Sequence, residues 1–531
     1  MKSQKEVILN AEQQEAVNAR DGVFMVVASP GAGKTTVLIN RHLQMLISGV
    51  SSQDMLNLTF TNSAAKEMGS RAGILGADSV FRTFHSYAIE ILKKEKQHLN
   101  FQLCESVIPV SMEDYQLLFD LCKIYPAINW RTLQEKITSW KCENILPDQA
   151  VEETRHNGIE YFYGLAYRDY EIKSRERGFL DFDSLMREVV NLLETNEEVR
   201  NRWKKKYISI DECQDTDSTQ VRFLELLFNG NLFCVGDMNQ GCYEWRSAAP
   251  DKLVNFVKKL PGVKTLYLGQ NFRSTKNLVS FFREIIPEDN GIASRMVSHN
   301  EDGVHPMITR YNDAEEEAEQ ILKSISDPIN SAVIARTNRQ LFVFQRMCIV
   351  KGIKYKILGK KDYFDQNEIK RLLSLAKDIK DSRPANVVLS DLIREHNLLH
   401  LYRHSGKPTE SSPIENMNSL VQISAGKGSI TQFLDYLRRL THARKSKKGL
   451  LLSTIHQFKG KEIDHAYVIG VKQGLLPHKD GEIAEEKRLW FVACSRAAQT
   501  LNISFYDNPS EFLSNYQDRI INFDYDWLSY D

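Results

Sequence analysis

The chain has 531 residues, of which 42% are hydrophobic and 26% are charged, a balance typical of a soluble globular protein with several domains. Lysine plus arginine number 69 and aspartate plus glutamate also number 69, so the formal net charge is zero. A net charge of zero argues against a protein that coats nucleic acid through bulk positive charge, but it is compatible with a local groove that holds a single strand.

The cysteines and the apolar runs indicate the cellular compartment in which we expect the protein. The eight cysteines are scattered and form no CxxC pair, which argues against a zinc or iron–sulfur site and indicates reduced thiols. The first residues, MKSQKEVILNAEQQ, contain no apolar signal core, and no apolar run is long enough to span a membrane. We therefore expect a soluble, cytoplasmic protein with no membrane partner.

The first predicted elements are a strand, a glycine-rich turn and a helix. Residues 22–28 are a continuous apolar run that suits a strand buried on both faces, and residues 34–47 carry apolar residues at helical spacing. Between them, Gly31 and Gly33 let backbone amides curl toward an anion at the positive end of the helix. The segment predicts a phosphate-binding loop. The alternative, a glycine-rich loop that binds no ligand, fits this context less well.

Three residues decide how this loop would work. We expect Lys34 to reach the outer phosphates of ATP and Thr35 to ligate Mg²⁺. A strict P-loop pattern has glycine where Ala28 stands. Because Ala28 lies at the end of the predicted strand, a methyl group there is compatible with an open loop.

An acidic pair follows a second predicted strand. Residues 207–210, YISI, form a short buried run that ends in Asp211 and Glu212. Beside a phosphate loop, Asp211 can hold Mg²⁺ and Glu212 can accept the proton of the attacking water. Gln214 can link this pair to a neighbouring motif. Acidic pairs on loops are usually only solvated, but the position after a buried strand favours the catalytic interpretation.

Helical and strand patterns alternate along the rest of the chain. Apolar spacing from 182 to 193 predicts a helix packed on the main fold, whereas residues 404–418 read as a loop-rich stretch. Short β-rich runs predict further strands of parallel α/β sheets at 231–237, 331–336, 450–456, 465–471 and 501–505.

The chain resembles the UvrD/Rep-type superfamily-one DNA helicases, whose motifs it shows in the family's order from about residue 9 to about residue 515. This family usually carries alanine where Ala28 stands. The resembling segments are the Q motif at 9–17, motif Ia at 59–68, Ib at 81–88, II at 211–216, III at 235–248, IV at 268–275, the start of the second motor half at 352–373, V at 453–464 and VI at 485–498.

The resemblance implies an ATP site with Mg²⁺ held by Thr35 and Asp211. Catalytic roles fall on Lys34, Asp211 and Glu212, on Gln240 as the sensor of the γ-phosphate, and on two arginine fingers from the second motor half, Arg273 and Arg496. ATP contacts are implied for Gln13, Ser29, Pro30, Gly31, Ala32, Gly33, Lys34, Thr35, Thr36, Phe272 and Glu462.

Two residues of this implied site depart from the family pattern. Phe272 stands where the family often has tyrosine stacked on adenine, and its ring keeps the stacking face. Lys461 stands where an apolar residue is common before the acidic residue that bonds the ribose.

The resemblance also implies a path for single-stranded DNA. Aromatic side chains interleaved with polar and basic groups suit such a path. From hydrophobicity alone, Phe60 and Phe84 are better explained as core residues. Contacts to DNA are implied for Phe60, Thr61, Asn62, Thr83, Phe84, His85, Tyr243, Trp245, Arg246, Thr454 and His456.

The implied fold is α/β, with two RecA-like P-loop motor domains that contain parallel sheets and are each interrupted by a mostly helical accessory insertion. ATP is expected between the two motors. The expected domains are motor 1A at 1–96 and 183–263, accessory domain 1B at 97–182, motor 2A at 264–382 and 446–531, and a reduced 2B-like insertion at 383–445.

The implied activity is ATP-driven movement 3′→5′ on single-stranded or tailed duplex DNA, in repair, replication, recombination or phage defence. The chain after Arg496 leaves no room for the β-hairpin with which relatives part a duplex, so translocation is better supported than autonomous unwinding. One alternative is a DNA-sensing ATPase subunit that works with a separate nuclease protein. Another is an RNA motor.

Overall fold

The structure, a computed structural model, describes residues 8–73, 81–99, 112–143, 145–177, 180–241, 250–359, 363–398, 413–444, 448–479 and 481–523. The chain divides into two compact units, one made of Met1–Asn271 with Asn290–Met296 and the other of Phe272–Asp289 with Val297–Asp531. No helix among the described residues is long and apolar enough to cross a membrane.

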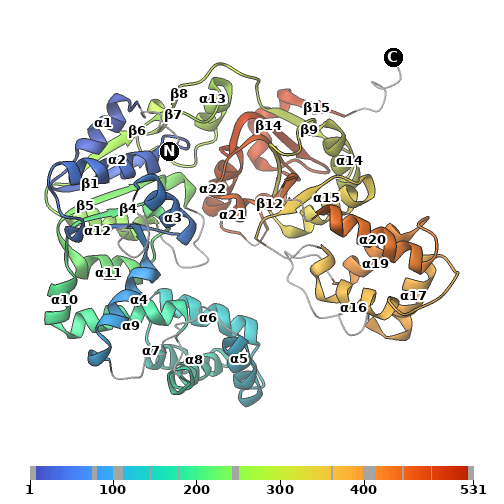
Figure 1. The fold of residues 1–531 in the computed structure, drawn as a ribbon, viewed down its shortest axis with the longest axis horizontal. Helices are drawn as coiled ribbons and strands as arrows, with labels where there is room; N and C mark the ends of the chain where they lie inside the picture. Colours follow the sequence, from blue (N-terminus) through green and yellow to red (C-terminus); the bar gives the residue numbers. More distant parts are fainter. Residues whose placement is uncertain are drawn as a thin grey trace. The chain divides into compact units, whose positions relative to one another are not determined.

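The first unit is built on a six-stranded parallel sheet in the order β3-β2-β4-β5-β1-β6 (Figure 1). All six residues of β1 are buried, as expected of a strand covered on both faces. The strands are β1 (Val23–Ala28), β2 (Met55–Thr59), β3 (Phe81–Thr83), β4 (Lys205–Ile210), β5 (Phe228–Gly236) and β6 (Lys264–Leu268), followed by the short β7 (Gln270–Asn271).

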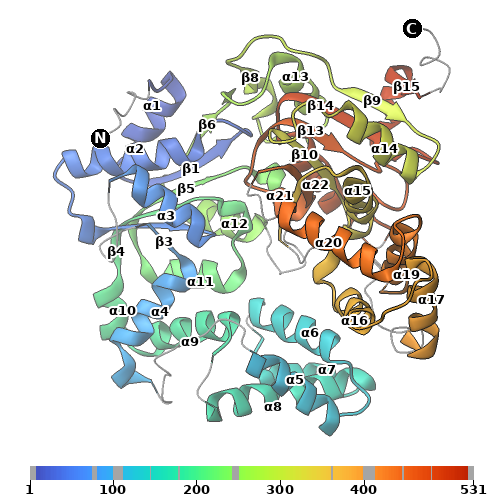
Figure 2. The ribbon, with the colours of Figure 1, turned by 45° about the vertical axis from the view of Figure 1, so that its right-hand side comes forward.

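Helices flank this sheet and form a separate group beyond it (Figures 1 and 2). Those of the motor are α1 (Ala11–Asn18), α2 (Lys34–Ile47), α3 (Asn62–Arg71), α4 (Phe84–Lys94), α9 (Phe182–Thr195), α10 (Glu197–Trp203), α11 (Ser218–Leu227) and α12 (Pro250–Lys259). The group beyond it contains α5 (Met112–Ile124), α6 (Trp130–Cys142), α7 (Pro147–Thr154) and α8 (Ile159–Glu176), which enclose a core of their own around Leu121, Leu133 and Tyr167.

The second unit contains a seven-stranded parallel sheet in the order β11-β12-β10-β13-β14-β9-β15. Its strands are β9 (Met307–Arg310), β10 (Ser331–Ala335), β11 (Tyr355–Ile357), β12 (Leu450–Thr454), β13 (Ile463–Val468), β14 (Ala497–Phe505) and β15 (Ile520–Asn522), with β8 (Val297–Ser298) outside it. Its helices are α13 (Lys276–Glu284), α14 (Ala314–Ser324), α15 (Asn338–Lys351), α16 (Asn367–Ala376), α17 (Ala385–Glu395), α19 (Pro413–Ser424), α20 (Ile430–Arg444), α21 (Ile455–Phe458) and α22 (Ile483–Cys494).

Helices α16, α17, α19 and α20 pack together. Their buried side chains, among them Leu389, Leu420 and Phe433, belong to the same hydrophobic core as Val333 of the sheet and Phe344 of α15. The described part of the segment 383–445 is therefore continuous with the core of the second unit rather than closed around a core of its own.

The predicted strands and the helices at 34–47 and 182–193 are confirmed, and two details are corrected. The strand at 264–268 pairs with β1, so the division expected after residue 263 falls before the last strand of the first sheet rather than after it. Residues 413–418 of the expected loop at 404–418 form the start of α19, because Pro413 supplies a helix-compatible φ in the first turn; residues 404–412 lie outside the described residues.

Candidate functional site

The order of the strands brings three of the predicted motifs together. The phosphate loop follows β1, the acidic pair follows β4, and Asp237 and Gln240 follow β5. Strand β5 lies between β4 and β1, and all three run parallel. The segments after their carboxyl ends are therefore neighbours at one edge of the sheet, where open α/β sheets bind ligands.

The phosphate loop has the backbone shape that an anion cradle needs. Gly31 and Gly33 have φ values of 68° and 79°, a left-handed conformation that glycine adopts without strain. A Cβ on Gly33 would lie 2.8 Å from Nε2 of Gln13, which itself donates to the Ala32 carbonyl at 3.0 Å. Because the first backbone bond of α2 runs from the Val37 amide to the Gly33 carbonyl, the amides of residues 34–36 precede the helix ladder and suit phosphate oxygens.

Hydrogen bonds to neighbouring segments hold the loop in place. Oγ of Ser29 donates to the Gly269 carbonyl at 3.0 Å, and Nδ2 of Asn271 donates to the Pro30 carbonyl at 2.8 Å. Ala28 is fully buried, and its methyl group is part of the apolar core of the first unit. Arg71, which the sequence did not single out, donates from Nη2 to Oγ1 of Thr36 at 3.1 Å and adds a second cation to the first turn of α2.

The acidic pair lies against the lysine of the loop. Nζ of Lys34 is 3.8 Å from Oε1 of Glu212. Glu212 has a left-handed backbone with φ 51° and ψ 45°, which costs a non-glycine residue about 1–2 kcal/mol and is typical of functional sites. Nε2 of Gln214 donates to Oε2 of Glu212 at 2.6 Å and fixes the direction of that carboxylate.

Asp211 of this pair and the neighbouring Asp237 are both buried carboxylates. Burial and the charge of Glu212 raise the pKa of Asp211 to about 7 although Lys34 opposes the rise. Burial likewise raises the pKa of Asp237 to about 6, and Oδ2 of Asp237 accepts from Nε2 of Gln240 at 2.6 Å. A divalent cation would relieve the repulsion between these carboxylates, so their oxygen atoms are suitable ligands for Mg²⁺. No group of three metal-ligating side chains occurs among the described residues, so phosphate and water oxygens would complete its coordination.

The implied residues of the second unit also lie near one another. Nε of Arg273 donates to Oε2 of Glu462 at 2.7 Å, and its Nη1 donates to the Ser495 carbonyl at 3.2 Å. Arg496 is 2% exposed and donates from Nε to the Val492 carbonyl at 2.9 Å. Arg273 is thus paired with Glu462, and Arg496 is held by oxygen atoms of Val492 and of neighbouring residues, all within this unit.

Other implied residues of the second unit have distinct surroundings. The ring of Phe272 lies 5.2 Å from that of His299. Thr454 is buried at the end of β12. Burial and the charges of Arg336 and Lys459 lower the pKa of His456 to about 4, so its imidazole is neutral at pH 7. Tyr243, Trp245 and Arg246 lie outside the described residues.

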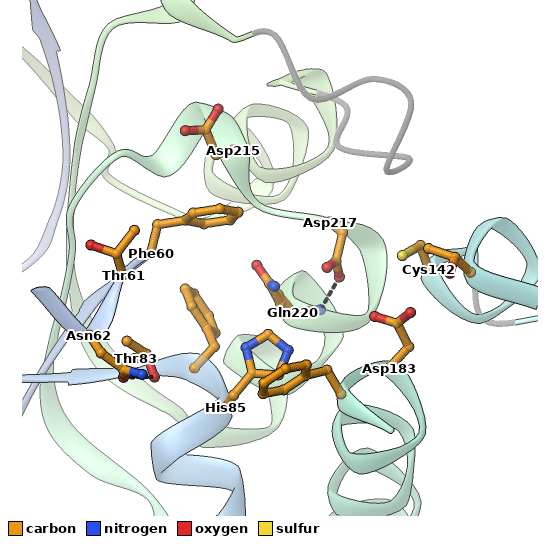
Figure 3. Close-up of a pocket in the computed structure, with 13 residues that line it drawn as sticks. Phe60, Thr61, Asn62, Thr83, His85, Cys142, Asp183, Asp215, Asp217 and Gln220 are labelled. Atoms are coloured by element: carbon orange, nitrogen blue, oxygen red, sulfur yellow. Dashed lines mark hydrogen bonds between the residues drawn. The ribbon is translucent and has the colours of Figure 1, made fainter. Parts of the chain in front are cut away.

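A pocket of about 280 Å³ in the first unit gathers the implied strand contacts of motifs Ia and Ib (Figure 3). Thr59 of β2 and Thr83 of β3 are paired across adjacent parallel strands, so the residues that follow them emerge side by side. We call this cavity the strand pocket, after the single DNA strand that motifs Ia and Ib imply. Its lining comprises Phe60, Thr61, Asn62, Thr83, Phe84, His85, Thr138, Cys142, Phe182, Asp183, Asp215, Asp217 and Gln220.

The pocket brings the residues implied by motifs Ia and Ib together with residues that the resemblance does not assign to DNA. Phe84 is only 3% exposed, so it serves as a wall, whereas Phe60 is half-buried. Apolar spacing predicts Phe182 only as the start of a packed helix, yet Phe182 is 39% exposed and its ring lies edge-on to that of His85 at 5.0 Å. The sequence could have pointed to Asp217 and Gln220, because they follow the acidic motif at 211–216 within about one helical turn.

The fold and the site define a P-loop motor protein with two RecA-like domains. The family model described as UvrD/REP helicase N-terminal domain matches residues 9–261, and that described as UvrD-like helicase C-terminal domain matches residues 266–393 and 388–508. The chain belongs to the UvrD/Rep helicase family.

Its relatives include proteins named ATP-dependent DNA helicase PcrA from two species. That of Staphylococcus epidermidis strain ATCC 12228 is 26% identical over 607 residues, covering 93% of this chain and 83% of the relative. That of Staphylococcus aureus strain NCTC 8325 is 26% identical over 611 residues, with the same two coverages.

Proposed function

We propose that this protein is a Mg²⁺-dependent ATPase that moves 3′→5′ along single-stranded DNA. The observation that carries the proposal is one short segment, residues 211–220. Its beginning supplies Glu212 to the phosphate site, and its end supplies Asp217 and Gln220 to the strand pocket. A strand that enters the pocket would press on the same segment that orients the catalytic carboxylate, which is the coupling that a DNA-stimulated ATPase requires.

The roles of the residues follow from their positions. Bound ATP with Mg²⁺ supplies a phosphoryl group that water can attack. Lys34 and the amides of residues 34–36 would hold the phosphates, and Thr35 and Asp211 would hold the metal ion. Glu212, aimed by Gln214, accepts the proton of the attacking water at its carboxylate.

Arg273 and Arg496 are proposed to stabilise the charge that develops on the phosphoryl oxygens. Guanidinium groups suit this task because they are planar, always charged and rich in donors. Replacement of either arginine by alanine is expected to lower kcat far more than it raises KM, which distinguishes this role from one in binding ATP alone.

Two assays run side by side test the proposal. ATP hydrolysis is measured with and without single-stranded DNA of mixed sequence, and strand displacement is measured on duplexes with a 3′ or a 5′ tail. Strong stimulation by the strand and a preference for the 3′ tail are the expected results. Absence of stimulation by single-stranded DNA would overturn the proposal. Equal stimulation by RNA would mean that the motor acts on either nucleic acid rather than on DNA alone.

A second candidate is a DNA-sensing ATPase subunit that relies on a partner nuclease and does not unwind alone. The region after Arg496 favours it, because residues 497–523, all described, contain β14, a 3₁₀ segment at Glu511–Arg519 and β15, without a β-hairpin. Purification of the native protein with size analysis would reveal a stable complex. A lone monomer that unwinds a tailed duplex would exclude this candidate.

A further inference from the structure

The strand pocket is rich in hydrogen-bond acceptors. Asp183, Asp215 and Asp217 line it together with Gln220, while no lysine or arginine is among the described residues that do so. A phosphate group placed here would meet carboxylates rather than cations. Beside these acceptors, a ligand group that brings N–H donors is favoured over a phosphate group.

Gln220 points to that ligand directly. Its side chain is 4% exposed, and its Oε1 atom has no hydrogen-bond partner. Figure 3 shows its amide in the space between the rings of Phe60 and His85. A buried acceptor without a partner costs free energy unless a ligand satisfies it, and such groups are uncommon in folded proteins.

The position of Gln220 is fixed by its own helix. Its backbone amide donates to Oδ1 of Asp217 at 2.8 Å, so Asp217 caps α11 and its carboxylate is held beside the pocket. The acceptor set is thus fixed before any ligand arrives.

The walls of the pocket match a flat ring. Phe60, Phe84 and Phe182 present apolar faces and edges, and the cavity of about 280 Å³ admits one nucleobase. Aromatic side chains hold unstacked bases through their faces without regard to base identity. The acceptors of the lining are what can distinguish one base from another.

We propose that this pocket receives one base of the bound strand and reads its exocyclic amino group through Oε1 of Gln220 and the carboxylate of Asp217. The proposal rests on the proposed function, because it assumes that a nucleic-acid strand occupies the pocket. Cytosine, adenine and guanine carry an amino group, whereas thymine and uracil present a carbonyl oxygen at the position of the cytosine amino group. That oxygen would face acceptors here and leave Gln220 without a partner.

The test compares two oligonucleotides of equal length, one of deoxycytidine and one of deoxyuridine, which differ only at ring position 4 and the adjacent nitrogen. The measured quantity is the strand concentration that gives half-maximal stimulation of ATP hydrolysis by the full chain. We expect this concentration to be about threefold to tenfold lower for the cytidine strand, the effect of one satisfied hydrogen bond.

Two variants test whether Gln220 and Asp217 cause the preference for the deoxycytidine strand. Gln220→Met keeps the length of the side chain and removes the acceptor, and Asp217→Asn keeps a helix-capping oxygen while one carboxylate oxygen becomes a donor. Each is expected to reduce the ratio between the two strands toward one, with circular dichroism melting as the check that the variants are folded. An equal response of the wild type to both strands, or an unchanged ratio in both variants, would overturn the inference. Absence of stimulation by either strand would instead count against the proposed function.

Discussion

Glu317 gives a sharp prediction about stability and pH. This glutamate of α14 is 2% exposed, and its Oε1 atom accepts two hydrogen bonds, from the Gly470 amide at 2.9 Å and from Oγ of Ser504 at 2.6 Å. Burial raises its pKa to about 7 even though both bonds and Lys472 oppose the rise. Glu317→Gln retains a carbonyl oxygen that can accept both bonds and removes the ionisation.

The direction in which stability changes with pH follows from how strongly the folded and unfolded chains bind a proton at Glu317. The folded chain holds a proton on Glu317 that the unfolded chain, with an ordinary pKa of 4.5, releases earlier. The stabilisation from the neutral carboxyl is therefore complete below pH 4.5 and is lost as the pH rises through about 7. Since one pKa unit corresponds to about 1.4 kcal/mol, ionisation of Glu317 costs the fold about 3 kcal/mol at pH 8.

The assay is thermal melting of the wild type and of Glu317→Gln at pH 5 and at pH 8.5. We expect nearly equal midpoints at pH 5 and a midpoint several degrees higher for the variant at pH 8.5. A difference between the two proteins that does not change with pH would refute the reasoning, as would a variant that is less stable only at pH 8.5.

Three other predictions concern hydrolysis and packing. Lys34→Ala and Glu212→Gln are both expected to lower ATP hydrolysis by about a hundredfold or more. Only Glu212→Gln should retain binding of a fluorescent ATP analogue. Loss of binding in both variants would contradict the role of Glu212 as the base. Lys141→Met removes the fully buried cation that pairs with two acidic side chains and should lower the free energy of unfolding by about 3–5 kcal/mol in thermal melts, whereas an unchanged midpoint would show that the pairing contributes nothing. Phe433→Ala should cost about 3–5 kcal/mol because it opens a cavity in the core of the second unit, while Val387→Ala, at a side chain 38% exposed in the same insertion, should change the midpoint little.

Much of the phosphate site could be predicted because its signals are local. The apolar run before Ala28 and the helical spacing after Lys34 place the loop between a strand and a helix, as the structure confirms. Asp211 and Glu212 follow directly from the end of a second buried strand. In each case the residues that set the backbone lie within a few positions of the residues that carry the chemistry.

The strand pocket could be predicted only in part because its walls come from distant segments. The register between Thr59 and Thr83, which brings Phe60 and His85 to one place, is a property of strand pairing and not of either segment alone. The edge-on contact between His85 and Phe182 spans almost a hundred residues of sequence. Hydrophobic spacing assigned Phe182 to a packed helix correctly, but it carries no information on which side chain of the first turn stays exposed.

The two insertions are joined to their units by different physical means, and this bears on how strand binding could be transmitted. The second shares its core with the sheet of its unit, so it could move only by exposing many apolar side chains, each worth about 1.5–3 kcal/mol.

The first has a core of its own and meets the motor through charge, since Nζ of Lys141 in α6 lies 2.5 Å from Oδ2 of Asp181, the residue that caps α9. Cys142 and Phe182, the next residue after each member of this pair, both line the strand pocket. A base entering the pocket would therefore act on both sides of a buried ion pair, whose strength depends steeply on distance and geometry. On the proposed function, we therefore expect strand occupancy to alter the motor through the first insertion rather than through the second.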